Sequence, residues 1–164
     1  MTPQARTTRF LVDSTAARLS RWLRFLGYDA VLDRSRSDAV LLARARREGR
    51  ALLTRKRVLG TSPGAAGGVL LLSSDFVSDQ LRQVASDLGL KHDSPPRCTV
   101  CNSELSPVTR AEVDGRVPEF VYRTRDEFAF CRRCDRYYWK GTHWENAARV
   151  SSAALSARQE RSRS

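Results

Sequence analysis

The chain has 164 residues, 41% of them hydrophobic, which is enough for one ordinary domain or for a small domain with a metal-stabilised module. No apolar run approaches the length of a membrane span, and the first residues lack the apolar stretch of a signal peptide, so we expect a cytoplasmic protein. The net charge of +11 and the pI of about 10.5 fit a protein that binds a polyanion, and RNA, DNA and the ribosome are the first candidates. The alternative is an ordinary solvated cationic surface without a partner.

The first half of the chain alternates between short apolar runs and segments with helical spacing. The predicted strands are residues 9–12, 28–32, 51–54 and 69–72, and the predicted helices are residues 14–26, 37–49 and 77–88. The strands are uniformly apolar, as expected when both faces of a sheet are covered. This alternation predicts an α/β fold in which a parallel sheet is flanked by helices, with domain limits at 8–92.

Polar side chains follow the predicted strands. Asp13, Thr54 and Asp75 fall at or just after strand ends, and Asp38 begins the helix after another strand. Working sites of parallel sheets lie at the carboxyl ends of their strands. Each of these aspartates also fits a simple helix cap. Asp29 and Asp33 are interpreted as loop residues.

The second half begins after Pro95 and Pro96 and contains the chain's only cysteines. They form two C-x2-C pairs, Cys98 with Cys101 and Cys131 with Cys134, and 29 residues separate the pairs. This spacing predicts a tetrahedral zinc site in a small zinc ribbon at 97–146. Two disulfides, or four unrelated buried thiols, are the alternatives. Residues 116–122 are expected to be extended, and residues 150–164 to form a disordered basic tail.

Several of these stretches resemble one known family. They are Phe10–Asp13 (FLVD), residues 18–29 (RLSRWLRFLGYD), residues 51–55 (ALLTR), the two cysteine pairs and residues 138–144 (YWKGTHW). Their order and spacing resemble the PIN-like RNase domain with an appended zinc ribbon, the family named after the C-terminal RNase domain of the Mut-seven exonucleases. The resemblance covers about residues 8–146. It implies a PIN-like fold and a ribonuclease that hydrolyses RNA phosphodiester bonds.

The resemblance also implies a site in which carboxylates hold Mg²⁺ or Mn²⁺ ions that polarise the phosphate and activate water. It assigns Asp13, Asp38 and Asp75 as catalytic residues, with Asp13 and Asp38 as metal ligands. The chain departs from the family pattern at Lys56, where an acidic residue usually follows Leu-Thr-Arg. A cation there repels metal ions. The alternatives are therefore a lapsed nuclease that binds RNA or ribosomes, and a module that docks on an acidic protein.

Basic residues supply the predicted RNA contacts. Arginines recur every three residues on the first helix and can hold successive phosphates, although a solvated helix face has the same pattern. Aromatic residues of the ribbon can stack on unpaired bases, or can simply pack the ribbon. The partner is expected to be RNA, including tRNA or the ribosome. The predicted RNA-binding residues are Arg18, Arg21, Arg24, Arg55, Lys56, Arg132, Arg133, Trp139 and His143.

Overall fold

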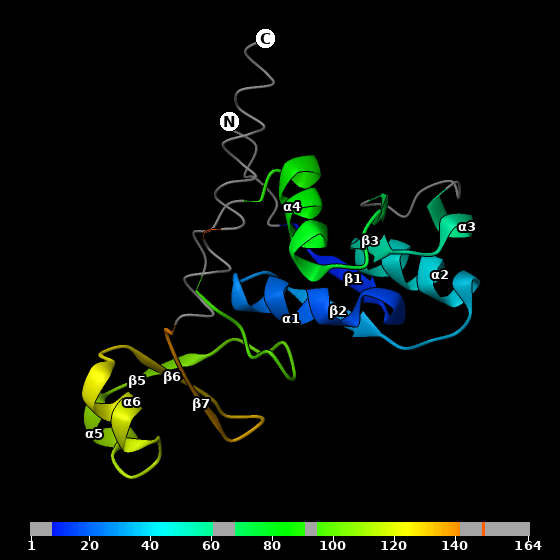
Figure 1. Ribbon diagram of the computed structural model, residues 1–164. Coiled ribbons are helices and arrows are strands. Elements are labelled where there is room, and N and C mark those ends of the chain that lie inside the picture. The colour runs from blue at the N-terminus through cyan, green and yellow to red at the C-terminus, as the bar shows by residue number, and fades with distance from the viewer. Residues whose placement is uncertain (1–7, 61–67, 91–94, 142–148, 150–164) are drawn as a thin grey trace, which may run out of the picture.

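The computed structural model describes residues 8–60, 68–90, 95–141 and 149. Figure 1 shows two lobes, an α/β lobe from the first half of the chain and a smaller lobe from the second. The predicted tail at 150–164 and His143 lie outside the described residues. Within those residues, no helix is both long enough and apolar enough to cross a membrane.

The α/β lobe follows the predicted alternation of strands and helices. Its elements are β1 (Phe10–Asp13), the 3-10 turn η1 (Ser14–Ala16), α1 (Ala17–Phe25), β2 (Ala30–Asp33), α2 (Asp38–Glu48), β3 (Ala51–Thr54), α3 (Arg57–Gly60), β4 (Val69–Leu71) and α4 (Val77–Leu88). The four strands are parallel and lie in the order β2-β1-β3-β4. The predicted α/β class is confirmed.

The sheet is buried on both faces because alternate residues of β1 and β3 point to opposite sides. Phe10 and Val12 pack with α1 and α4, whereas Leu11 packs with α2 and with Leu59 of α3. The core therefore has two apolar layers, which explains why the strands lack a polar face. This packing makes the sheet a rigid base for the residues at the ends of its strands.

Helix boundaries follow the predicted capping residues. Asp13 caps η1 by accepting the Thr15 amide, and Ser37 caps α2 by accepting the Val40 amide. α2 and α4 both end at a left-handed glycine, Gly49 and Gly89. β2 begins two residues later than predicted, because the Tyr28 amide still bonds to the Leu23 carbonyl of α1 at 2.9 Å.

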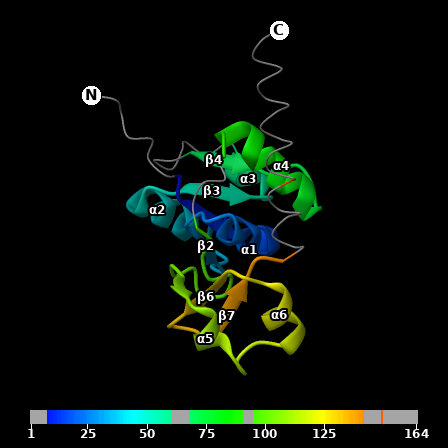
Figure 2. The same ribbon diagram turned by 90° about the vertical axis from the view of Figure 1, so that its left-hand side faces the viewer.

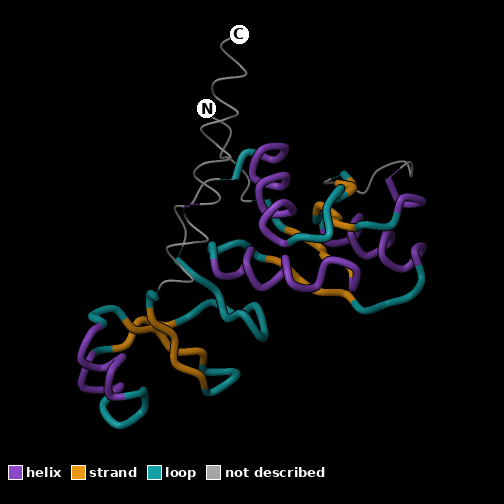
Figure 3. Tube along the Cα trace, in the orientation of Figure 1, coloured by secondary structure: helices purple, strands orange, loops and turns teal. Residues whose placement is uncertain are grey.

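The smaller lobe contains an antiparallel sheet of β5 (Ser106–Val108), β6 (Phe128–Cys131) and β7 (Arg136–Trp139), in the order β5-β6-β7. Two short helices, α5 (Arg110–Val113) and α6 (Glu119–Thr124), precede β6 (Figure 3). The prediction of an extended segment at 116–122 is therefore wrong. Pro118 caps α6, and the Arg110 guanidinium lies 4.6 Å from the centre of the Tyr122 ring, which pairs the two helices.

Candidate functional site

Asp13 is the central carboxylate at the carboxyl end of the sheet. It is fully buried at the end of β1, next to β2 and β3 in the sheet. Its Oδ1 accepts the Thr15 amide at 2.9 Å and the Thr15 hydroxyl, and its Oδ2 accepts the Thr54 hydroxyl at 2.8 Å. No cation forms an ion pair with Asp13 among the residues that the structure describes. Neutral donors alone therefore satisfy this buried anion.

The other carboxylates at this edge each have a cation of their own. The Lys56 ammonium lies 2.7 Å from Asp38 Oδ1, and the Arg55 guanidinium pairs with Asp75. Asp33, which we interpreted as a loop residue, instead ends β2 beside Asp13 and pairs with Arg44 at 2.7 Å. Burial raises the pKa of Asp33, but hydrogen bonds from Arg44 and Ser35 hold it below its ordinary value. The edge is thus largely neutralised by its own side chains.

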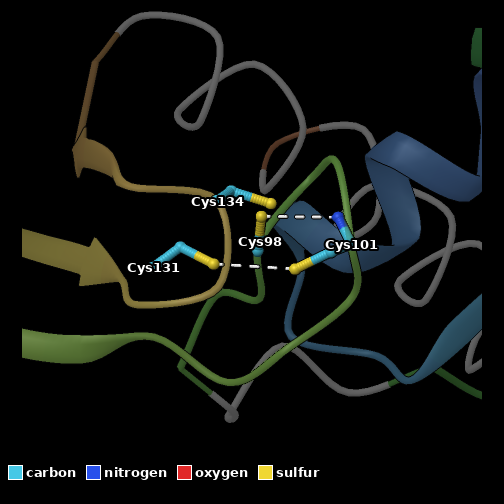
Figure 4. A group of neighbouring side chains, drawn as sticks. All are labelled: Cys98, Cys101, Cys131 and Cys134. Atoms are coloured by element: carbon cyan, nitrogen blue, oxygen red, sulfur yellow. Dashed lines mark hydrogen bonds between the residues drawn. The ribbon is translucent and has the colours of Figure 1, made fainter.

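The four cysteines do come together, as predicted. Their sulfur atoms lie within 4.8 Å of one another and point toward a common centre between two turns (Figure 4). All four are free thiols, so the alternative of two disulfides is not what the structure forms. Cys98 and Cys101 belong to the loop before β5, whereas Cys131 is the last residue of β6 and Cys134 lies in the turn between β6 and β7. These soft ligands at this spacing can hold a zinc ion.

The two cysteine turns share one backbone feature. Asn102 and Asp135, each directly after the second cysteine of its pair, are the residues other than glycine with a positive φ, 69° and 52°, among those described. A left-handed residue at that point lets the chain turn away from the sulfurs. The equal position in both pairs indicates two equivalent metal-binding turns.

The pKa values of the neighbouring cysteines shift in opposite directions. Burial raises the pKa of Cys101, but the hydroxyl and amide of Ser103 outweigh it and lower the pKa to about 6. Hydrogen bonding to Cys101, with burial, raises the pKa of Cys134 to about 12. One thiolate in the cluster therefore makes the next harder to form. A divalent cation removes this conflict, because it is attracted by all four thiolates.

The predicted phosphate contact of Arg24 is wrong. Its side chain is buried, and the guanidinium donates to the Ala30 carbonyl at 2.8 Å and to the Thr99 and Val100 carbonyls at 2.8 and 3.0 Å. Burial lowers the pKa of Arg24, and the neighbouring Cys98 and Cys101 raise it. The helical period explains the error, because a residue three positions after exposed Arg21 has turned toward the first cysteine turn.

A polar network links the two lobes. Asn102 accepts the Ala30 amide at 3.1 Å and donates to Asp29 at 2.6 Å. Asp29 in turn forms a bidentate ion pair with Arg50, whose Nη1 and Nη2 donate to Oδ1 and Oδ2 at 2.8 and 3.0 Å. The smaller lobe consequently lies below α1 and β2 in Figure 2. Nothing in the sequence identified Asn102, because its role depends on this tertiary contact.

The remaining predicted RNA contacts lie on the surface. The side chains of Arg18, Arg21, Arg132 and Arg133 are exposed and make no hydrogen bond or ion pair within the described part of the chain. Trp139 is 36% exposed and lines a cavity of about 450 Å³ between the lobes, together with apolar side chains of both. Arg21 lines a second hollow of about 400 Å³ with Trp22, Phe25 and Thr99.

The protein thus joins a parallel α/β domain with aspartates at its strand ends to a small lobe with four clustered cysteines. The family model described as Mut7-C RNAse domain matches residues 8–151, so the chain belongs to this family. Comparisons with curated proteins and with solved structures give no match.

Proposed function

We propose that this member of the Mut7-C RNase family binds RNA, and that the carboxyl end of its sheet receives a phosphate. The observation that carries the proposal is Lys56, whose ammonium lies 2.7 Å from Asp38 at this edge, where an acidic residue usually stands. Arg55 is its neighbour and pairs with the largely exposed Asp75. Both cations lie on the short segment after β3, and a phosphate would bind them by displacing the aspartates with which they are paired.

The acidic residues do not fit a site that three carboxylates build around a divalent ion. Among the described residues, only the four cysteines form a group of three or more ligands close enough for one ion. Asp33, Asp38 and Asp75 are each engaged with a cation. A phosphate group, which prefers Arg and Lys donors, suits the same edge better than a hard metal ion does.

Cleavage of RNA with Mg²⁺ or Mn²⁺ is the second candidate function, and Asp13 favours it. This buried carboxylate has only neutral partners, so it can still be drawn to a cation. An RNA phosphate would compete with Asp38 for Lys56 and with Asp75 for Arg55. RNA binding would then leave these two carboxylates without their cations, a condition that the second candidate requires.

Other surfaces support RNA as the partner. Arg21, an exposed arginine of α1, lines a hollow with Trp22, Phe25 and Thr99 of the first cysteine turn. Trp139 lines the neighbouring cavity between the lobes, whose wall is mainly apolar and whose rim includes Arg97 and Lys140. A flat aromatic side chain with nearby cations can stack on an unpaired base of the RNA while the RNA phosphates remain in solvent.

We also propose that Cys98, Cys101, Cys131 and Cys134 bind one zinc ion with a structural role. Four thiolates complete a tetrahedral site and leave no open position for chemistry. The lobe's three short strands enclose little apolar area, so a metal centre would supply much of its stability. Elemental analysis of the purified protein would measure the zinc content.

Binding and cleavage can be separated with labelled RNA. Wild type should bind single-stranded RNA without added Mg²⁺ or Mn²⁺, and Arg55→Gln or Lys56→Gln should weaken binding, whereas Arg82→Gln on the exposed face of α4 should not. Competition by tRNA and ribosomal RNA would identify the preferred class of RNA. Cleavage that needs Mn²⁺ or Mg²⁺ and is lost in Asp13→Asn would establish the second candidate, and unaltered binding in both cation variants would contradict the first.

A further inference from the structure

Arg24 is a buried cation without a carboxylate partner. Only 6% of its surface is exposed, and within the described residues no acidic side chain forms an ion pair with it. Arg50 provides the contrast, because it is nearly as buried at 8% but pairs with both Asp29 and Glu48. A buried charge is costly unless an opposite charge balances it, so the lack of an anion at Arg24 requires an explanation.

The hydrogen bonds of Arg24 point to the missing anion. Nε donates to Ala30 in the α/β lobe, while Nη1 donates to the carbonyls of Thr99 and Val100. Thr99 and Val100 are the two residues between Cys98 and Cys101. The guanidinium is therefore hydrogen-bonded to the turn that carries two of the four sulfur atoms.

The net charge of the cysteine cluster depends on its protonation and on its metal content. Four thiols without metal are neutral when protonated, whereas four thiolates around one Zn²⁺ carry a net charge of minus two. Asp29, the acidic residue near Arg24, is already engaged by Arg50 and Asn102, and Arg21 adds a further positive charge on the same helix. The metal-loaded cluster is thus the anion available to balance Arg24.

We propose that the zinc–tetrathiolate centre is the counter-charge of Arg24, and that this pairing couples zinc binding to docking of the ribbon on the nuclease-like lobe. Arg24 is then a positioning residue for the first cysteine turn. Further hydrogen bonds continue the same junction, since the Arg97 amide donates to the Arg24 carbonyl at 2.8 Å and the Asn102 side chain bonds to the Ala30 amide and to Asp29. This inference does not depend on RNA binding.

Zinc affinity provides the test, measured in the full chain by competition with a chelating dye. Arg24→Gln keeps hydrogen-bond donors but removes the charge, and it should weaken zinc binding by about 10- to 100-fold, as loss of a partner that orients a metal ligand does. Arg24→Lys keeps the charge and should retain part of the affinity. Arg82→Gln, which removes an exposed arginine of α4 outside both cysteine turns, is the control and should change affinity by less than about 3-fold.

Thermal unfolding with and without zinc separates this role from simple packing. The rise in Tm that zinc produces in wild type should be smaller in Arg24→Gln. If Arg24→Gln lowers Tm equally with and without zinc and leaves the zinc affinity unchanged, Arg24 only stabilises the packing between the lobes and the proposal is overturned. The same holds if wild type binds no zinc, or if Arg24→Lys binds zinc no better than Arg24→Gln. RNA binding is measured separately, so failure of one proposal does not mask failure of the other.

Discussion

Replacing Asp29 by Asn should measure how much the junction between the lobes contributes to stability. Asp29 accepts two hydrogen bonds from Arg50, at 2.8 and 3.0 Å, and one from Asn102 at 2.6 Å. An Asn side chain has the same shape but offers one acceptor, so at least one of these bonds is lost together with the negative charge. Arg50 keeps Glu48 as a partner. We expect a loss of about 2–3 kcal/mol, because a hydrogen bond to a charged group contributes about 1.5–3 kcal/mol.

The pH dependence makes this expectation specific to the carboxylate. Burial raises the pKa of Asp29, but the bonds from Arg50 and Asn102 outweigh it, and the pKa in the folded protein lies below its ordinary value. A carboxyl whose pKa is lowered by folding stabilises the protein above its unfolded pKa, and this stability is lost as pH falls through the folded pKa. The gap in unfolding free energy between wild type and Asp29→Asn should therefore be full at neutral pH and close in acid.

Chemical denaturation at a series of pH values measures this gap. Asp87→Asn is the matched control, since Asp87 is exposed on α4 and has no partner among the residues described. The control should differ from wild type by less than about 0.5 kcal/mol at each pH. If the gap for Asp29→Asn equals that of the control, or stays constant into acid, the Asp29 carboxylate does not stabilise the fold through these bonds.

Three further predictions concern other surfaces. Arg18→Gln with Arg21→Gln should flatten the plot of log RNA affinity against log salt by about 2, one unit for each phosphate contact, and an unchanged slope would mean a solvated face. Trp139→Leu should weaken RNA binding by about 1–3 kcal/mol in a titration if the indole stacks on a base, and unaltered affinity would mean that it only packs the ribbon. Asn102→Ala should unfold more readily than Asn102→Gly by about 1 kcal/mol, because Asn102 has a φ of 69°, and equal stabilities would contradict a strained left-handed turn.

Much of the fold could be predicted because local signals agree with tertiary packing. The uniformly apolar strands predicted a sheet covered on both faces, and the glycines at 49 and 89 marked helix ends where the chain does turn left-handed. α6 was missed because its six residues carry no strong helical period, and Pro118 was the one local signal for its start. The cysteine spacing predicted the cluster because two residues suffice to close each turn.

The candidate site was harder to predict, because pairing between side chains depends on positions far apart in the sequence. Asp13 and Thr54 could be expected at one edge from strand order alone. That Arg44, Lys56 and Arg55 would each neutralise a carboxylate could not, since those pairs are set by helix and loop positions. Arg24 showed the same limit, because a period of three on a helix does not tell an exposed arginine from one that faces a second lobe.

The proposed role of Lys56 can be tested by comparing wild type with Lys56→Asp on labelled single-stranded RNA with Mn²⁺. We propose that Lys56 makes the edge of the sheet a phosphate-binding site rather than a metal site. We therefore predict that wild type binds the RNA with little cleavage, and that Lys56→Asp binds less tightly but cleaves faster, because a carboxylate replaces the cation beside Asp38. Rapid Mn²⁺-dependent cleavage by wild type, with no gain in Lys56→Asp, would contradict it.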